Sequence, residues 1–404
     1  MADCNRTIVE VAAGPHDRTN AFVTFLCIDS CTEEAVHVVW EVDAAGQPGA
    51  VVPSQCLNEM CGCGEEECDC SCEIAWMVPE LKAGETKRYM IGLTDQEQEY
   101  EGGVVVDIKD EGEAAFSING APFTSYVFKE GIARPFCYPV YGPNGKIIVR
   151  EVNIPAKDGI DHPHHKGFWV AQGAVNDNED NWSEMEGHAT TVCQQLAVLS
   201  EGPVFGEIIA FNDWMSGRHG VQKKMLEEHT RVRVYNTPDN GRIMDWSITF
   251  LATEGGFHFG DTKEAGTLSV RLKESMEERN GGTMVNSFGA KGEAENWGKR
   301  AEWVDYYGDV EGDVMGITMM DHPGNHGYPT HWHVRSYGLF TANQWGLHDF
   351  TGDQGIRGDL TVKDGDYLTF RFRVYIHAGT TCEAQVKAQY LNFVFPPTVK
   401  TVEQ

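Results

Sequence analysis

The chain has 404 residues, of which 41% are hydrophobic and 23% charged, and its formal net charge at pH 7 is −29. These values exclude wholesale disorder, and 32 Lys and Arg against 61 Asp and Glu exclude nucleic acid as a partner, because phosphate binding needs a basic surface. No apolar run is long enough to span a bilayer, so no membrane partner is expected. The 44 glycines and 10% aromatic residues favour a turn-rich, all-β protein.

The first twenty residues lack the basic start and apolar core of a signal peptide, which predicts a cytoplasmic protein. Six of the 12 cysteines lie between Cys56 and Cys72. In a chain with no export signal, free thiols or a metal clip are expected rather than a disulfide framework.

Residues 1–97 are predicted to form a small β-sandwich. Apolar runs at 7–13, 21–29 and 35–44 are separated by turn-forming residues, and 73–93 reads as two strands joined by a Gly turn. A Cys-rich insert, residues 56–72, interrupts this module. It lacks the C-x-x-C pairs of structural zinc sites, which leaves both metal binding and a thiol-rich hairpin tip open.

Residues 98–404 are predicted to form a large antiparallel sandwich, since most of their apolar runs alternate with polar residues. The expected strands cover 104–108, 114–118, 147–152, 206–214, 231–236, 245–254, 267–272, 312–320 and 366–377. Residues 143–146, PNGK, predict a turn. One helix is expected over 382–394, capped by Thr380 or Thr381 and ended by Pro396.

Three segments concentrate titratable and aromatic side chains. Residues 161–184 hold three histidines within four positions and two tryptophans; Pro163 predicts a loop there, which leads into a strand over 167–173. In residues 321–346, an extended stretch over 330–340 would place four polar side chains on one face, His331, His333, Arg335 and Tyr337, and three apolar ones on the other, Trp332, Val334 and Phe340. Residues 257–266 read as a loop that gathers the polar side chains His258, Asp261, Lys263 and Glu264. We expect the three segments to converge on one pocket.

These motifs resemble the PmoA-like family, and the resemblance covers about three quarters of the chain. The matching stretches are DHPHHKGFW, FGDTKEAG, NWGKRAEWVDYYG, DHPGN, PTHWHVRSYGLFTAN and RFRVYIHAG. The resemblance implies a galactose-mutarotase-like supersandwich over 98–404, a scaffold of carbohydrate-active epimerases, lyases and glycosidase accessory domains. It places the site on a concave sheet face.

On that scaffold, histidines and carboxylates are suited to acid–base chemistry on a sugar, with the histidines as acids and Asp261 or Glu264 as the base. The predicted catalytic residues are His164, His165, His188, Asp261, Lys263, Glu264 and His333. The predicted substrate-binding residues are Trp169, Asn181, Trp182, Arg335, Tyr337, Asn343 and His377, and the predicted metal ligands are His162 and His331.

The prediction is therefore an enzyme acting on a sugar or oligosaccharide as a hydrolase, lyase or epimerase, with a divalent metal as candidate cofactor and a second copy of the chain as candidate partner. Two alternatives stay open. A non-catalytic carbohydrate-binding protein would need the aromatic residues but no base, and a structural module would be favoured if the histidine segments lay far apart.

Overall fold

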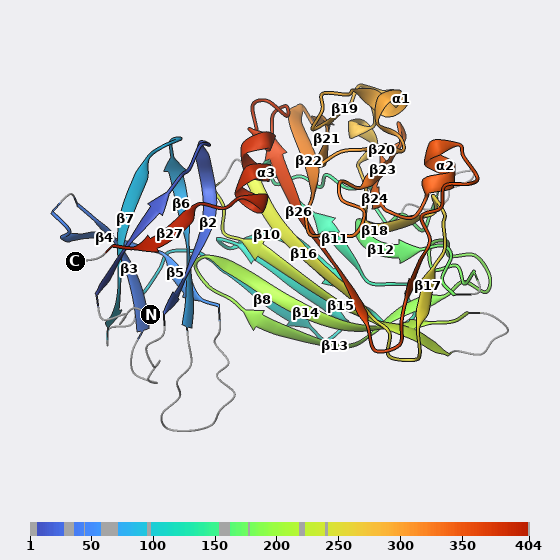
Figure 1. Cartoon of the computed structure of the whole chain (residues 1–404), viewed down its shortest axis with the longest axis horizontal. Helices are drawn as coiled ribbons and strands as arrows, with labels where there is room; N and C mark the ends of the chain where they lie inside the picture. The colour runs from blue at the N-terminus through green and yellow to red at the C-terminus, as the bar shows by residue number, and fades with distance from the viewer. Residues whose placement is uncertain are drawn as a thin grey trace.

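The computed structural model describes residues 6–27, 36–43, 45–57, 72–94, 98–152, 162–176, 178–217, 223–238 and 241–402. The described chain forms two β modules lying side by side (Figure 1). The predicted all-β class is confirmed. Most of the Cys-rich insert, and with it the predicted metal clip, lies outside the described residues.

The smaller module packs a five-stranded sheet, in the order β27-β1-β7-β3-β4, against a three-stranded sheet, β2-β6-β5. Its strands are β1 (Thr7–Ala12), β2 (Arg18–Cys27), β3 (Val36–Val42), β4 (Pro48–Val52), β5 (Ser54–Cys56), β6 (Cys72–Leu81), β7 (Thr86–Thr94) and β27 (Thr398–Thr401). Strand β27 comes from the end of the chain and is visible in red among the blue N-terminal strands (Figure 1). The predicted domain boundary at residue 97 does not account for this C-terminal strand in the smaller module.

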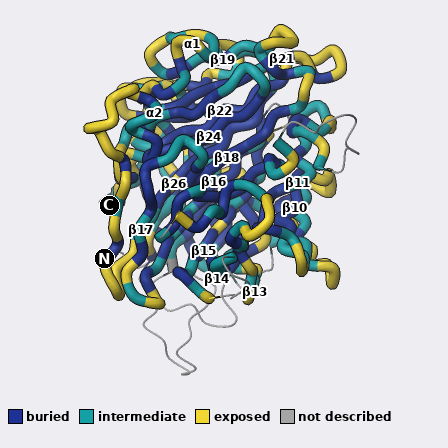
Figure 2. Tube along the Cα trace, turned by 90° about the vertical axis from the view of Figure 1, so that its right-hand side faces the viewer, coloured by how far each residue is buried: buried dark blue, intermediate teal, exposed yellow. Residues whose placement is uncertain are grey.

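The larger module is a supersandwich of a nine-stranded sheet, β20-β23-β24-β18-β12-β11-β10-β9-β8, and an eight-stranded sheet, β13-β14-β15-β16-β26-β22-β21-β19. The strands of the nine-stranded sheet are β8 (Val104–Lys109), β9 (Glu113–Ile118), β10 (Ala121–Val127), β11 (Phe136–Val140), β12 (Phe168–Gln172), β18 (Ala265–Arg271), β20 (Lys299–Arg300), β23 (His331–Val334) and β24 (Leu339–Asn343). Those of the eight-stranded sheet are β13 (Thr190–Ser200), β14 (Phe205–Met215), β15 (Lys224–Tyr235), β16 (Gly241–Leu251), β19 (Thr283–Asn286), β21 (Trp303–Val310), β22 (Asp313–Asp321) and β26 (Tyr367–Ala378). Buried segments run through the middle of the module, while exposed ones gather at its rim (Figure 2).

Shorter elements complete the large module. They are a β17 (Phe257–Phe259) and β25 (Leu360–Val362) pair, helices α1 (Gly292–Asn296), α2 (Leu347–Thr351) and α3 (Val386–Val394), and the 3-10 turns η2 (Glu274–Met276) and η3 (Glu278–Asn280). The C-terminal helix was predicted, but it begins after Gln385, so neither Thr380 nor Thr381 caps it. Residues 147–152, predicted as a strand, make only isolated bridges.

Strand alternation gives the nine-stranded sheet one face that packs in the core and one outer face. Phe168 and Val170 of β12 join the core between the two sheets, whereas Trp169 points to the outer face. The predicted strand over 330–340 is a hairpin instead, because β23 and β24 are joined by a turn at 335–338. The apolar side chains of both strands face the core as predicted: Trp332 and Val334 in β23, and Phe340 in β24.

Two cysteines of the smaller module, Cys27 and Cys56, are disulfide-bonded. The expectation that its thiols would be free is therefore wrong for these two cysteines. Disulfides persist in oxidising compartments, so these residues weigh against the predicted cytoplasmic location. Cys137, Cys193 and Cys382 are free. In the described part of the chain, no helix has the length and apolar character needed to cross a membrane.

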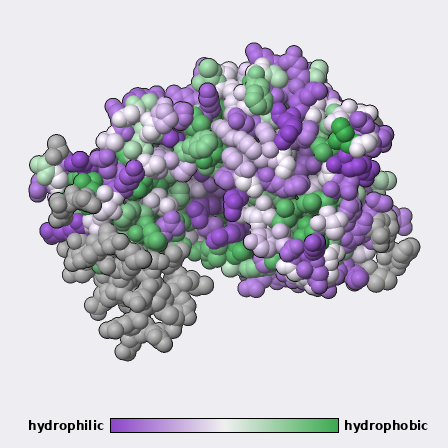
Figure 3. Space-filling model, in the orientation of Figure 1, coloured by the Kyte–Doolittle hydropathy of each residue, from purple (hydrophilic) through white to green (hydrophobic). Residues whose placement is uncertain are grey.

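Gln55 joins the two modules. Its amide nitrogen donates to Ser200 Oγ at 2.6 Å and to the Phe205 carbonyl at 3.0 Å. Its amide oxygen accepts from the backbone N–H groups of Val204 and Phe205, both at 3.1 Å. The surface visible in Figure 3 is mostly hydrophilic, with scattered apolar patches.

We expect Gln55→Ala to destabilise the junction, because truncation leaves buried donors and acceptors without partners, at a cost of about 1–3 kcal/mol. Calorimetry should show a lower first unfolding transition, ascribed to the smaller module. The exposed Gln47→Ala serves as a control. An unchanged transition in Gln55→Ala would show that the modules are held together by other contacts.

Candidate functional site

The histidine loop, residues 162–167, is fixed by backbone contacts just before β12. The Arg150 guanidinium donates to the carbonyls of His162 and His165, and the His165 N–H donates to the His162 carbonyl at 3.1 Å. Gly167 has φ +53°, and a Cβ there would lie 1.9 Å from the Cys137 carbonyl oxygen. The loop therefore holds its rings against the outer face of the nine-stranded sheet.

Four rings form the centre of the site, and we call them the ring cluster: His164, His165, Trp169 and Trp182. His165 stacks on Trp169 with ring centroids 5.2 Å apart, and Trp182 lies 5.7 Å from Trp169. His164 lies edge-on to His165 at 4.4 Å and to Trp182 at 6.1 Å. Trp169 and Trp182 are 1% and 2% exposed, so they form the floor of the site and not an open stacking platform.

Tyr337 connects this ring cluster to the β23–β24 hairpin. It stacks on His162 with centroids 5.2 Å apart and lies under the guanidinium groups of Arg271, at 4.8 Å, and Arg335, at 5.4 Å. Arg335 in turn pairs with Glu293 of α1 at 2.9 Å. The first and second histidine-rich segments therefore lie together.

The loop over 257–266 meets the same hairpin. The backbone carbonyl of Lys263 accepts from His333 Nδ1 at 2.8 Å. Electrostatic interactions also connect Glu264 with both His164 and His333. The three segments thus lie together, as predicted, and the charge of Glu264 is felt by both histidines.

Hydrogen bonds determine which ring nitrogen carries a proton. Arg271 Nη1 lies 3.3 Å from His165 Nδ1, and because a guanidinium can only donate, Nδ1 accepts and the proton lies on Nε2. In His333, Nδ1 donates to the Lys263 carbonyl, so Nε2 keeps a free lone pair. The two rings thus offer one donor and one acceptor.

Several buried ring nitrogens have no hydrogen-bond partner among the described residues. They are His164 Nε2, His165 Nε2, Trp169 Nε1, Trp182 Nε1 and His333 Nε2. Buried polar atoms are normally paired, and an unpaired one costs about 1–3 kcal/mol, so a group of them indicates a place that a ligand or water completes.

Burial keeps three histidines of the site, His164, His165 and His333, neutral at pH 7. Burial first, and the positive charge of Arg134 second, lower the pKa of His164 to about 4. Burial likewise lowers the pKa of His333 to about 4, although its hydrogen bond to the Lys263 carbonyl opposes the shift. The pKa of His165 lies well below its ordinary value for the same reason.

The two carboxylates of the 257–266 loop have different environments. Asp261 has a fully buried side chain whose oxygens accept from His348 Nδ1 and from the Gly358 N–H, so it organises the loop over 346–358. Glu264 is 46% exposed and pairs with Lys263 at 2.7 Å. The prediction of Asp261 as a base is not supported, because it has no free oxygen to offer.

Other predicted residues serve the scaffold or lie elsewhere. Asn343 donates to the carbonyls of Thr262 and Lys263 and accepts from two backbone N–H groups, which uses its whole amide. His377 lies in the eight-stranded sheet, where it bonds Asp305 at 3.0 Å. Both were predicted to bind substrate, and the structure corrects both.

Two further predicted site residues, His188 and Asn181, bond to neighbouring protein groups. His188 bonds the neighbouring Ala189 carbonyl at 2.8 Å and has no ring contact with the cluster among the described residues. Asn181 is buried and donates to Thr191 at 3.1 Å, while its Oδ1 has no partner in the described chain.

The predicted metal ligands do not form a metal site. His162 stacks on Tyr337, whereas His331 stacks on Phe350. Among the described residues, no three His, Cys, Asp or Glu side chains are grouped so that they could hold a metal ion.

The sequence reading missed Arg134 and the ion pair of Lys166 with Glu184. Arg134 is 3% exposed, donates to the Trp182 carbonyl at 2.9 Å and lies 3.5 Å from Glu184, which Lys166 also contacts at 2.8 Å. Burial lowers the pKa of Arg134 to about 10. Arg134 is separated from Glu184 by 50 positions, and no local pattern marks it as a site residue.

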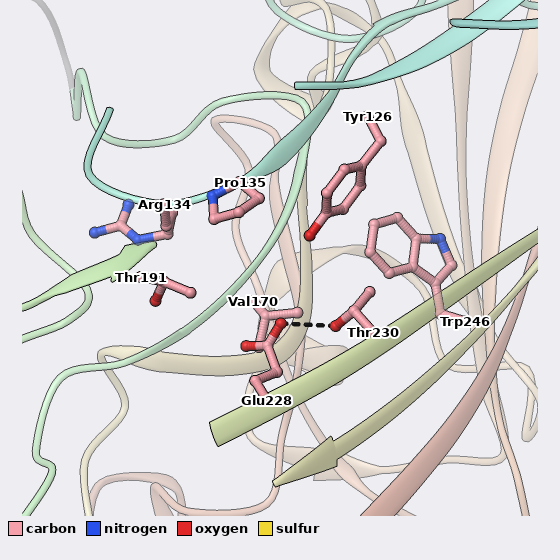
Figure 4. Close-up of a pocket in the computed structure, with 8 residues that line it drawn as sticks. All are labelled: Tyr126, Arg134, Pro135, Val170, Thr191, Glu228, Thr230 and Trp246. Atoms are coloured by element: carbon pink, nitrogen blue, oxygen red, sulfur yellow. Dashed lines mark hydrogen bonds between the residues drawn. The ribbon is translucent and has the colours of Figure 1, made fainter. Parts of the chain in front are cut away.

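A small cavity lies inside the supersandwich, beside Arg134 (Figure 4). Its volume is about 10 Å³, which admits one water molecule at most. Glu228 projects into it and accepts from Thr230 at 2.6 Å and Trp214 at 2.8 Å, and burial raises the pKa of Glu228. This cavity is too small for a substrate, so the outer face remains the candidate site.

We expect Asp261→Asn to destabilise the protein by about 1–3 kcal/mol, because an amide NH₂ would face the donors that Asp261 now accepts from. Chemical unfolding measures the change, with Asp359→Asn as an exposed control. Full stability together with lost activity in Asp261→Asn would return this residue to a catalytic role.

We also expect stability to fall as pH decreases from about 6.5 to about 4, because His164 and His333 take up protons in the unfolded chain before they do so in the fold. At about 1.4 kcal/mol per pKa unit, His333 accounts for about 3 kcal/mol of this loss. In His333→Gln the dependence of unfolding free energy on pH should be shallower. An identical slope in variant and wild type would contradict it.

The comparisons with solved structures bear on the fold. A protein in the Glycosyl Hydrolase Family 38 from Enterococcus faecalis superposes with a TM-score of 0.51 at 12% identity, over 100% of this chain and 48% of that one. An alpha-mannosidase from Enterococcus faecalis gives 0.48 at 10% identity, over 100% and 46%. Galactose 1-epimerase from Lactobacillus acidophilus gives 0.27 at 9% identity, over 70% and 97%. The chain thus spans about half the length of the first two structures.

The comparisons with sequences give one family. No curated protein matches the chain. The resemblance to the PmoA-like family stays a prediction, since the matching family model has a different description. That model covers residues 113–391, which include the supersandwich strands from β9 to β26 and the whole ring cluster. The chain therefore belongs to a family of unknown function, DUF6807.

Proposed function

We propose that this protein is a carbohydrate-active enzyme whose site is the outer face of the nine-stranded sheet, with His164 and Glu264 as the groups that exchange protons with the sugar. One observation carries the proposal: five buried ring nitrogens of the same site have no partner among the described residues. A bound molecule rich in hydroxyl groups would complete them.

A sugar fits this demand for two reasons. Its hydroxyls can both donate and accept. One can accept from the Nε2–H of His165, and another can donate to Nε2 of His333. Its C–H groups can pack on the part of the half-buried Tyr337 ring that His162 and the two guanidinium groups leave exposed. The fold likeness to a protein in the Glycosyl Hydrolase Family 38 raises the expectation of sugar chemistry by analogy.

The lowered pKa of His164 supports a role as proton acceptor. At neutral pH the ring is uncharged, so it can accept a proton but has no imidazolium proton to deliver. This reverses the acid role expected from the sequence. Glu264, a partly exposed carboxylate, is the second proton-transfer group. Hydrolysis, elimination and epimerisation each need one proton removed and one delivered. The group that removes the first proton, Glu264 or His164, delivers it again in its protonated form, so the proposal includes all three reaction classes.

Carbohydrate binding without turnover is the alternative, and the Lys263–Glu264 ion pair favours it. At 2.7 Å, Lys263 competes with any proton transfer that Glu264 would perform. In that case the ring cluster binds the sugar, and Lys263 and Glu264 only orient it.

A panel of monosaccharides, glycosides and oligosaccharides tests the proposal, with binding and turnover measured separately. We expect Glu264→Gln to bind the active compound as the wild type does and to lose turnover about 10²–10⁴-fold, because the amide keeps size but not basicity. The exposed Glu101→Gln is the matched control. Binding with no turnover in the wild type would support the binding protein, and no binding to any sugar would overturn both readings.

A further inference from the structure

We infer that the carbohydrate is an oligosaccharide, and that its further units lie in a groove over β8, β9, β10 and β11, beside the ring cluster. This rests on the proposed function and adds the chain length of the substrate. The groove is a cavity of about 410 Å³ whose lining includes Asp107, Lys109, Glu113, Ser125, Pro139 and Tyr141. This volume lies within the usual range for small-molecule sites.

Strand register shows that groove and ring cluster share one face of the sheet. Trp169 pairs with Phe136, Phe136 with Val127, Val127 with Glu113, and Glu113 with Lys109. Directly paired residues point to the same side of a sheet. This row therefore leads from the floor of the ring cluster to the wall of the groove without leaving the outer face.

The length of this row exceeds a single sugar ring. Strands β12 and β9 are three steps apart, which is roughly 14 Å at about 4.8 Å per step. One ring held by His164 and Glu264 can reach at most the near end of the groove at β11, whereas a chain of rings can extend to β9. Phe136 and Val127 are buried, so the chain would pass beside the half-buried Tyr138.

Tyr138 lies between the ring cluster and the groove. It packs against the cluster that contains Trp169 and Trp182, and its Cβ lies close to Gly167 of the histidine loop. The next residue, Pro139, lines the groove, and so does the half-buried Tyr141. Half-exposed tyrosines offer a ring face to C–H groups and a hydroxyl to hydrogen bonds.

The rest of the groove suits hydroxyl groups. Its floor has small outward side chains, since Ser125 pairs with Ala115 and Ala115 with Asp107 across the sheet. One wall carries the Lys109–Glu113 pair, at 3.4 Å, and the exposed carboxylate of Asp107. Such a surface offers donors and acceptors beside a shallow floor, which a flexible polar chain can follow.

A chain-length series tests the inference. For the sugar type that binds in the panel, we expect affinity to rise about tenfold or more from the monosaccharide to the tetrasaccharide in calorimetry. Tyr141→Ala should remove most of this gain and leave monosaccharide affinity unchanged. Tyr367→Ala, an exposed tyrosine of the eight-stranded sheet, is the matched control. Asp107→Ala, at the exposed wall, gives a second variant that leaves the core untouched.

The outcomes separate the two proposals. Equal affinity for one and four units, or a full chain-length gain in both Tyr141→Ala and Asp107→Ala, would overturn the groove and leave the ring-cluster site standing. Absence of binding at every chain length would overturn the proposed function, and the groove with it. A chain-length gain that survives in Glu264→Gln supports binding in the groove independently of turnover.

Discussion

The site depends on one buried cation, Arg271. It is 1% exposed on the outer face of the nine-stranded sheet, and Glu277, whose side chain is 2% exposed, lies 3.3 Å from it. A buried charge costs several kcal/mol of desolvation, and removing its partner costs about 3–5 kcal/mol, so the pair is fixed in place. Arg271 also determines the tautomer of His165 and lies over the ring of Tyr337. The Arg271–Glu277 ion pair therefore determines the positions of the His165 and Tyr337 rings.

The same arrangement explains why the site is built from neutral histidines in a strongly acidic chain. Arg271 and Arg134 lie beside His165 and His164 and lower their pKa values in addition to burial. The rings consequently act as fixed donors and acceptors and carry no charge, while charged groups such as Lys166 and Glu184 surround them. A site of neutral rings, in which the buried cations are already engaged by protein groups, suits a neutral polyhydroxylated ligand better than an ion.

Local patterns in the sequence were sufficient for the fold class, the facing of β23, and the grouping of the histidine segments. Period-two alternation determines facing, so Trp332 could be assigned to the core and His333 to the outer face. Alternation does not say which sheet a strand joins, and His377 was misplaced for that reason. Arg134 and β27 depend on contacts between positions far apart in the chain, which no local spacing encodes.

Asp261 and Glu264 show why residue type alone could not name the base. They lie in one loop, three positions apart, and both are carboxylates near histidines. The loop turns Asp261 inward, where backbone N–H groups of the 346–358 segment occupy it, and leaves Glu264 46% exposed. An acceptor already saturated by N–H donors cannot also take a proton from a substrate without breaking those bonds. The carboxylate available for chemistry is thus decided by backbone donors that lie almost a hundred residues further along the chain.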